Sequence, residues 1–372
     1  MCFQINYVSY EPMCFQILNN INSNSKMIIN QLVRKNILAL KPYSSARDEF
    51  KGEASVFLDA NENPFNNGLN RYPDPLALSV KALISKQKNM PVEQIFTGNG
   101  SDEVIDVLVR VFCEPRIDHI ITLPPTYGMY EVSADTADVA VKKIALNSDF
   151  QPNIHAILSN MNAHSKILFL CSPNNPTGNA IQWETIQTLV EQFSGIVAID
   201  EAYIDFSKQP SCLSLLEKYP NLVVMQTFSK AWGLAGIRLG MAFASRAIID
   251  LMNKVKPPYN VNQLTQKAAI QALTQVEKTN KKIQAILKQR TLLENALKKE
   301  ASVEKIYPSD ANFLLVKTQN ANDLYSFLVK NGIIVRNRSN ILLCEDCLRI
   351  TVGTAVENQK LLQAWKSFET TP

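Results

Sequence analysis

Histidine is scarce in this sequence, and long apolar runs are missing. Only three of the 372 residues are histidine, and no run approaches the roughly eighteen apolar residues that a membrane-spanning helix needs. No secretory signal pattern opens the chain. The 38 Lys and Arg residues stand against 34 Asp and Glu and form no dense basic stripe. These absences argue against a membrane partner and a nucleic-acid partner, and they favour a cytoplasmic protein that acts on small molecules.

The cysteines follow neither a disulfide pattern nor a zinc pattern. Seven of them lie at irregular spacing, and "CEDC" at Cys344 to Cys347 is the one C-x-x-C. A zinc site needs two more ligands, and the histidines at positions 119, 155 and 164 offer none at a suitable spacing. We therefore expect reduced thiols and no metal.

Short apolar segments alternate with helical patterns from Glu93 onward. Runs such as "KILFLC", "GIVAID" and "NLVVMQT" are typical of buried strands, and the segments between them repeat apolar residues every three or four positions. This alternation predicts an α/β domain with a largely parallel sheet, whose ligands gather at the carboxyl ends of the strands. Beyond Asn260 a long helical stretch is followed by strands and one helix, which predicts a smaller α+β domain.

These patterns divide the chain into four parts. Residues 1–26 repeat "MCFQI", continue into a polar stretch and are expected to form a flexible extension. Residues 27–60 are expected to pack with the small domain. Residues 61–260 are expected to form the large domain, and residues 261–372 a linking helix and the small domain.

Polar motifs follow the predicted strands of the large domain. In "FTGNGSDEV", Gly100 and Ser101 offer backbone N–H groups and a hydroxyl at a helix N-terminus, which suits a phosphate, although an ordinary capped turn has the same pattern. "CSPNNPTG" places Asn175 in a proline-fixed loop. "AIDEAYIDF" places Asp200 at the end of an apolar run, where a buried acid needs a partner, with Tyr203 close behind.

"TFSKAWGLAGIRLG" supplies Ser229, Lys230 and Arg238 after a further strand. A lone lysine there would be read as a solvated side chain, but the whole order of motifs fits pyridoxal 5′-phosphate. An amine is needed to form a Schiff base with the cofactor aldehyde, and a guanidinium and hydroxyls bind its phosphate. Asp200 would pair with the pyridine nitrogen, and Tyr203 and Asn175 would donate to the phenolic oxygen.

The ordered motifs resemble those of the fold type I pyridoxal-phosphate-dependent aminotransferases. The segments "GNGSDE", "PPTYGMY", "SPNNPTG", "DEAYIDF" and "CLRITVG" carry the resemblance over nearly all of residues 37–368, and "LDANENPF" and "NRYPDP" are similar to the histidinol-phosphate aminotransferases in particular. The resemblance implies a large domain with a mainly parallel sheet between helices and a smaller α+β domain. It also implies amino-group transfer between glutamate and imidazole-acetol phosphate, giving L-histidinol phosphate and 2-oxoglutarate in histidine biosynthesis.

The resemblance also implies residue roles, with Lys230, Asp200 and Tyr203 as catalytic residues. Tyr127 resembles the aromatic residue that stacks on the cofactor ring, although Tyr130 is of the same type. A homodimer with shared active sites is implied as well, because Tyr72 resembles a tyrosine that reaches the cofactor phosphate of the neighbouring subunit. The full cofactor-binding set is Gly100, Ser101, Asp102, Tyr127, Asn175, Asp200, Tyr203, Ser229, Lys230, Arg238 and Tyr72.

For the substrate, the resemblance assigns Arg349 to a carboxylate, and Arg336 and Tyr43 to the distal phosphate, with Asn175 beside them. Arg338 is a rival for the phosphate because it lies two residues away on the same face of a predicted strand. The nearest alternatives keep the fold and change the reaction, to an aromatic or phenylalanine aminotransferase or a phosphothreonine decarboxylase. A non-catalytic binding protein is the remaining alternative, and the joint presence of Lys230 and Asp200 argues against it.

Overall fold

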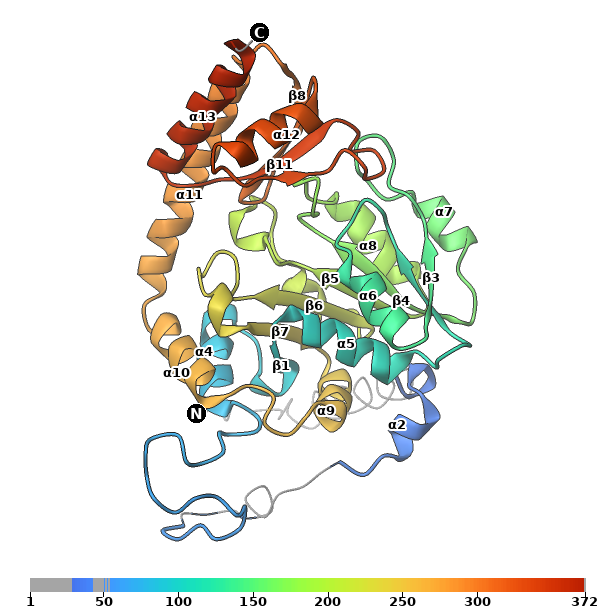
Figure 1. Ribbon diagram of the computed structural model, residues 1–372. Coiled ribbons are helices and arrows are strands. Elements are labelled where there is room, and N and C mark those ends of the chain that lie inside the picture. The colour runs from blue at the N-terminus through green and yellow to red at the C-terminus, as the bar shows by residue number, and fades with distance from the viewer. Residues whose placement is uncertain (1–28, 43–49, 51, 53, 371–372) are drawn as a thin grey trace, which may run out of the picture.

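The computed structural model describes residues 29–42, 50, 52 and 54–370 (Figure 1). The extension predicted over residues 1–26 and the substrate-binding assignment of Tyr43 lie outside the described residues. Among the helices of the described ranges, none has the length and apolar character needed to cross a bilayer.

The large domain is built on a seven-stranded sheet in the described part of the chain, with the strand order β1-β7-β6-β5-β4-β2-β3. β7 runs antiparallel to both of its neighbours, and the other neighbouring pairs are parallel. The predicted mainly parallel sheet is therefore confirmed. The strands are β1 (Ile95–Asn99), β2 (His119–Thr122), β3 (Ala140–Lys143), β4 (Ser165–Cys171), β5 (Ile196–Asp200), β6 (Leu222–Thr227) and β7 (Leu239–Ala244).

Helices cover both faces of this sheet, so its central strands are buried on both sides. In β5, Val197 and Ile199 enter one hydrophobic core, while Ile196 and Ala198 enter the other. This explains why the strand reads as a continuous apolar run rather than an alternating one. The first core contains residues of α4 (Leu78–Lys88), α7 (Ile154–Ser159), α8 (Trp183–Gln192) and α10 (Gln263–Leu273), and the second contains residues of α5 (Ser101–Phe112), α6 (Met129–Thr136) and α9 (Arg246–Val255).

The small domain has a four-stranded antiparallel sheet in the described chain, with the order β10-β11-β9-β8. Helix α11 (Val276–Leu297) joins the two domains, since Ile283 belongs to a core of the large domain whereas Leu293 and Leu297 belong to the core of the small one (Figure 1). The other elements are β8 (Val303–Ile306), β9 (Phe313–Thr318), β10 (Arg336–Asn337), β11 (Cys347–Thr351), α12 (Ala321–Lys330) and α13 (Ala355–Thr370).

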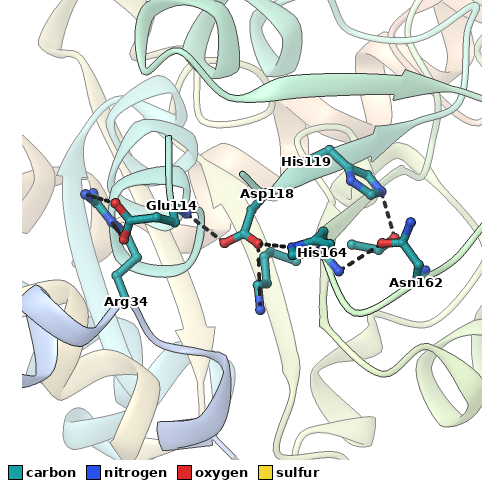
Figure 2. Close-up of polar contacts among 8 residues, drawn as sticks. Arg34, Glu114, Asp118, His119, Asn162 and His164 are labelled. Atoms are coloured by element: carbon teal, nitrogen blue, oxygen red, sulfur yellow. Dashed lines mark hydrogen bonds and ion pairs between the residues drawn. The ribbon is translucent and has the colours of Figure 1, made fainter. Parts of the chain in front are cut away.

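Residues 29–37 pack on the large domain, which differs from the expectation that residues 27–60 pack with the small one. Ile29, Val33 and Ile37 are buried in the core that holds α5 and α9. Arg34 donates its backbone N–H to the carbonyl of Val111 at 3.1 Å, and its guanidinium pairs with Glu114 at 3.2 Å (Figure 2). The spacing of four residues puts the three apolar side chains on one face, but spacing does not specify which surface that face will cover.

Candidate active site

A cavity of about 610 Å³ opens where the carboxyl ends of β4, β5 and β6 meet the small domain. Its position agrees with the rule that ligands bind beyond the carboxyl ends of parallel strands. Most of the residues predicted from the sequence line it, from both domains. Those residues are Ser101, Asp102, Tyr127, Asn175, Asp200, Tyr203, Ser229, Lys230, Arg238, Arg336 and Arg349, and Arg338 lines the cavity with them.

One end of the cavity is suited to an anion. Ser101 begins α5, so the first backbone N–H groups of that helix are free of intrahelical partners. Ser229 and Arg238 line the same cavity, and the Thr227 hydroxyl, 3.1 Å from the Ser229 hydroxyl, fixes the position of Ser229. Thr227 has no place among the residues predicted from the sequence, although it ends β6 and begins the segment "TFSKAWGLAGIRLG".

Two glycines make this anion site possible. Gly100 has φ +84°, and a Cβ atom there would lie 2.6 Å from an Arg238 guanidinium nitrogen. A Cβ at Gly240 would lie 2.2 Å from the backbone nitrogen of Ser101. Any side chain at these positions would push β7 and Arg238 away from the start of α5. Gly100 thus shapes the site without lining the cavity.

Asp102 orients two of its neighbours. Its Oδ1 accepts a hydrogen bond from the Tyr127 hydroxyl at 3.0 Å, and its Oδ2 pairs with Arg238 at 3.3 Å. Both carboxylate oxygens are therefore engaged by the protein. A carboxylate would also repel a phosphate, so this geometry favours Asp102 as a residue that positions Tyr127 and Arg238.

Asp200 lies at the end of β5 and is 3% exposed. Its Oδ1 accepts from the backbone N–H of Ala202 at 3.0 Å, and its Oδ2 accepts from the Tyr130 hydroxyl at 2.8 Å. Burial raises the pKa of Asp200, and these two hydrogen bonds oppose that rise because they stabilise the carboxylate. A buried acid that faces the cavity with one donor on each oxygen still has lone pairs for a cationic ligand.

Lys230 follows β6 and lines the cavity opposite the small domain. Its Nζ is 5.6 Å from the centre of the Tyr203 ring. Partial burial lowers the pKa of Lys230, and the nearby guanidinium of Arg349 lowers it further. A lowered pKa increases the fraction of neutral amine, which is the form that attacks a carbonyl.

The structure separates the roles of the two tyrosines on or next to α6. Tyr127 lines the cavity, whereas Tyr130 is fully buried behind it. Their rings meet edge to face, with centroids 5.6 Å apart. Of the two candidates for the aromatic residue that stacks on a ring-shaped ligand, only Tyr127 is placed in the cavity. The contact between Tyr130 and Asp200 is a feature that the sequence motif did not reveal.

Three guanidinium groups form the small-domain wall of the cavity. Arg336 on β10 is paired in register with Arg349 on β11, so their side chains share one face of the sheet. The Nε of Arg338 is buried and has no hydrogen-bond partner. Arg349 donates to the side-chain oxygen of Asn175, 174 residues away. Within the described residues, none of the three arginines forms an ion pair with a carboxylate.

Tyr72 is a predicted cofactor residue that lines a different hollow of the chain and not this cavity. It is 51% exposed and stacks on Tyr259 with ring centroids 4.4 Å apart.

Cys344 and Cys347 are both buried free thiols, and burial raises the pKa of each to about 12.

Residues 54–365 match the family described as aminotransferase class I and II. The chain belongs to this family. As a class I and II aminotransferase, it is 53% identical over 343 residues to a histidinol-phosphate aminotransferase of Christiangramia forsetii, which covers 92% of this chain and 98% of that one. It is likewise 53% identical over 342 residues to a histidinol-phosphate aminotransferase of Bacteroides thetaiotaomicron, covering 92% and 99%.

Solved aminotransferase structures share its fold. A histidinol-phosphate aminotransferase from Clostridium acetobutylicum aligns with a TM-score of 0.74 at 25% identity, over 81% of this chain and 91% of that one. An aspartate aminotransferase from Thermotoga maritima aligns with a TM-score of 0.73 at 19% identity, over 95% and 96%. The fold expected from the sequence, a large mainly parallel domain with a smaller α+β domain, is confirmed.

The residues of this aminotransferase fit pyridoxal phosphate. Gly100 and Gly240 allow the N–H groups at the start of α5, the serine hydroxyls and Arg238 to lie together at one end of the cavity. This set of donors matches a phosphate. Buried Asp200, with a free lone pair on each oxygen, matches a protonated ring nitrogen. Lys230 lines the same cavity, and its amine matches the cofactor aldehyde.

Proposed function

We propose that this chain is a histidinol-phosphate aminotransferase, which moves an amino group reversibly between glutamate and imidazole-acetol phosphate. The products are L-histidinol phosphate and 2-oxoglutarate. The observation that carries this proposal is the wall of three arginines without carboxylate partners, facing Lys230 across one cavity. Such a wall suits substrates that carry a distal anion, as both glutamate and a phosphorylated amine do.

Pyridoxal phosphate, when bound, supplies an aldehyde that reacts with amines and a ring that withdraws electrons from the substrate Cα. We assign its phosphate to Ser101, Ser229 and Arg238, its ring face to Tyr127, and its ring nitrogen to Asp200. Tyr203, at 6% exposure, and Asn175, at 9%, are assigned to its phenolic oxygen. The phenol of Tyr203 stays a hydrogen-bond donor, because burial raises its pKa.

Lys230 is the amine that binds the cofactor aldehyde, and it is the base that moves a proton from the substrate Cα. The lowered pKa of Lys230 favours both roles, because the neutral amine is the nucleophile and the base. Arg349 holds the carboxylate of glutamate, and Asn175 fixes the orientation of Arg349. Arg336 holds the distal anion, which is the phosphate of one substrate and the side-chain carboxylate of the other.

A substrate-range assay tests the proposal. Purified protein loaded with pyridoxal phosphate is given 2-oxoglutarate with histidinol phosphate, histidinol, phenylalanine or phosphothreonine. We expect glutamate formation with kcat/KM at least about tenfold higher for histidinol phosphate than for the amines without phosphate. A preference for phenylalanine would instead assign the aromatic reaction, and carbon dioxide release from phosphothreonine would assign the decarboxylase.

We also propose that the enzyme works as a homodimer with shared sites. The segment that contains Tyr72 exposes large apolar side chains, among them Leu58 at 88%, Phe65 at 81% and Leu69 at 55%. Soluble monomers rarely leave extended apolar surface in water. Tyr72 also lies away from the cavity of its own chain, as expected for a residue that serves a neighbouring site.

Mixing two inactive variants tests this sharing. When Tyr72→Ala and Lys230→Ala chains are dissociated together and reassociated, one site of each mixed dimer contains both a native Tyr72 and a native Lys230. We expect activity to return in the mixture and not in either parent. A protein that stays monomeric in light scattering, or a mixture without recovered activity, would contradict shared sites.

A further inference from the structure

Tyr130 is a buried tyrosine whose hydroxyl contacts the carboxylate of Asp200 and the thiol of Cys171. It lies on α6, has 0% exposure and does not line the cavity. Its hydroxyl donates to the Oδ2 of Asp200 at 2.8 Å, while the backbone of Ala202 donates to Oδ1 at 3.0 Å. The two donors approach different oxygens, so together they fix the plane of the carboxylate.

The ring of Tyr130 is clamped between two other aromatic rings. It stacks on Phe169 of β4 with centroids 4.5 Å apart and an interplanar angle of 6°. It also packs edge to face against Tyr127. A ring held on two sides cannot turn its hydroxyl away without breaking close packing. The Tyr130 hydroxyl is therefore a fixed donor rather than an adaptable one.

The charges around this contact determine which group holds the proton. Burial and the charge of Asp200 raise the pKa of Tyr130 well above its ordinary value, so Tyr130 keeps its proton. Burial raises the pKa of Asp200, and the hydrogen bond from Tyr130 is the first of the effects that oppose this rise. The backbone N–H of Ala202 and the charge of Lys230 also lower the pKa of Asp200, whereas the charge of Asp102 raises it. A buried carboxylate without such a donor would tend to bind a proton itself.

We propose that Tyr130 is a positioning residue that holds Asp200 in place and keeps it ionised, so that a proton shared with the cofactor ring nitrogen stays on the nitrogen. This inference rests on the proposed function, because it needs the ring nitrogen to face Asp200. It adds a residue that touches neither substrate nor cofactor and acts through Asp200 and, by its packing, through Tyr127.

The test uses Tyr130→Phe, which removes one oxygen atom and keeps the ring packing. Holoenzyme is prepared with pyridoxal phosphate labelled with ¹⁵N in the ring, and the ¹⁵N chemical shift is measured at pH 7.5. We expect the wild-type nitrogen to be protonated and the variant nitrogen to move toward the unprotonated shift, with kcat reduced on the order of tenfold and a smaller change in KM. Tyr219→Phe is the matched control, since Tyr219 is also buried but precedes β6 at the opposite end of that strand.

A double-mutant cycle separates positioning from packing. If Tyr130 acts through Asp200, adding Tyr130→Phe to Asp200→Asn should change kcat by less than about twofold. An equal loss in both backgrounds, or an unchanged ¹⁵N shift in the single variant, would overturn the proposal. If Tyr130→Phe does not fold, 3-fluorotyrosine at position 130 replaces it. This side chain is a stronger donor of nearly the same shape, so the ring nitrogen should keep its proton to a higher pH than in the wild-type enzyme when the ¹⁵N shift is followed as pH is raised, whereas an unchanged or lower pH of proton loss would overturn the proposal. A wild-type protein without visible cofactor absorbance would instead contradict the proposed function itself.

Discussion

Replacing Arg336 with alanine should weaken catalysis on a phosphorylated substrate far more than on one without a distal anion. Arg336 faces Arg349 in register across β10 and β11, so a substrate with two anionic groups can bridge them. Losing one member of a buried, hydrogen-bonded charge pair typically costs about 2–5 kcal/mol. Arg336 is exposed to solvent in the described structure, which screens its charge, so we expect the lower part of that range.

A loss of about 2–3 kcal/mol corresponds to a decrease of roughly 30- to 160-fold in kcat/KM for histidinol phosphate. With phenylalanine the decrease should be less than about threefold. Arg336→Lys should recover only part of the loss, because lysine lacks the planar fork that grips phosphate with two hydrogen bonds. The melting temperature should not fall, since the substitution removes repulsion between two cations of the same face.

Steady-state kinetics with both substrates on Arg336→Ala and Arg338→Ala distinguishes a phosphate-binding role of Arg336 from a structural one. Arg338 is the matched control because it lines the same cavity and lies two residues away. Equal losses on both substrates would make Arg336 a structural residue. A selective loss at Arg338 would instead move the phosphate site to Arg338, whose buried Nε has no hydrogen-bond partner within the described chain.

Four further predictions follow from the site, the core and the sequence. Lys230→Ala should abolish both the visible absorbance of the bound cofactor and nearly all turnover; a normal turnover would refute its role as the amine. Asp200→Asn should reduce kcat severely and cofactor affinity less, and near-wild-type kcat in steady-state assays would exclude it as the partner of the ring nitrogen. Lys81 is 3% exposed, and burial, with the charge of Lys256 as a further cause, lowers its pKa to about 8. Between about pH 8 and 10.5 the unfolded chain then binds more protons at this site than the folded chain does. The free energy of unfolding therefore rises with pH across that window. Lys81→Met should remove this rise and stabilise the protein at pH 7 by about 2–3 kcal/mol in urea denaturation, and unchanged pH dependence would contradict the shift. A chain that begins at Met27 should match the full chain in activity and melting temperature. Ordering a polar segment such as "NNINSNSK" costs about 1–2 kcal/mol per residue, and a sequence without a periodic apolar face is not expected to recover that cost by burial. A large drop in either quantity would show that residues 1–26 contribute to the fold.

The sequence by itself determined the fold class and most of the chemical groups of the site. Continuous apolar runs such as "GIVAID" require burial on both faces of a strand, which a parallel sheet between helices provides. Asp200 and Lys230 could be singled out because each follows such a run, and the carboxyl ends of parallel strands lie at one edge of the sheet. Their positions after two such runs therefore predict that they lie near each other in the fold.

The tertiary structure decided what depends on contacts between distant parts of the chain. Tyr127 and Tyr130 are equivalent as sequence letters, and only the packing of α6 places one in the cavity and the other behind Asp200. Arg349 contacts Asn175 because the small domain packs against the carboxyl ends of the large-domain strands. Ile29, Val33 and Ile37 pack in the core that also contains α5 and α9. Periodicity tells which face of an element is buried, but the partner of that face is chosen by the shape and area of all the other surfaces together.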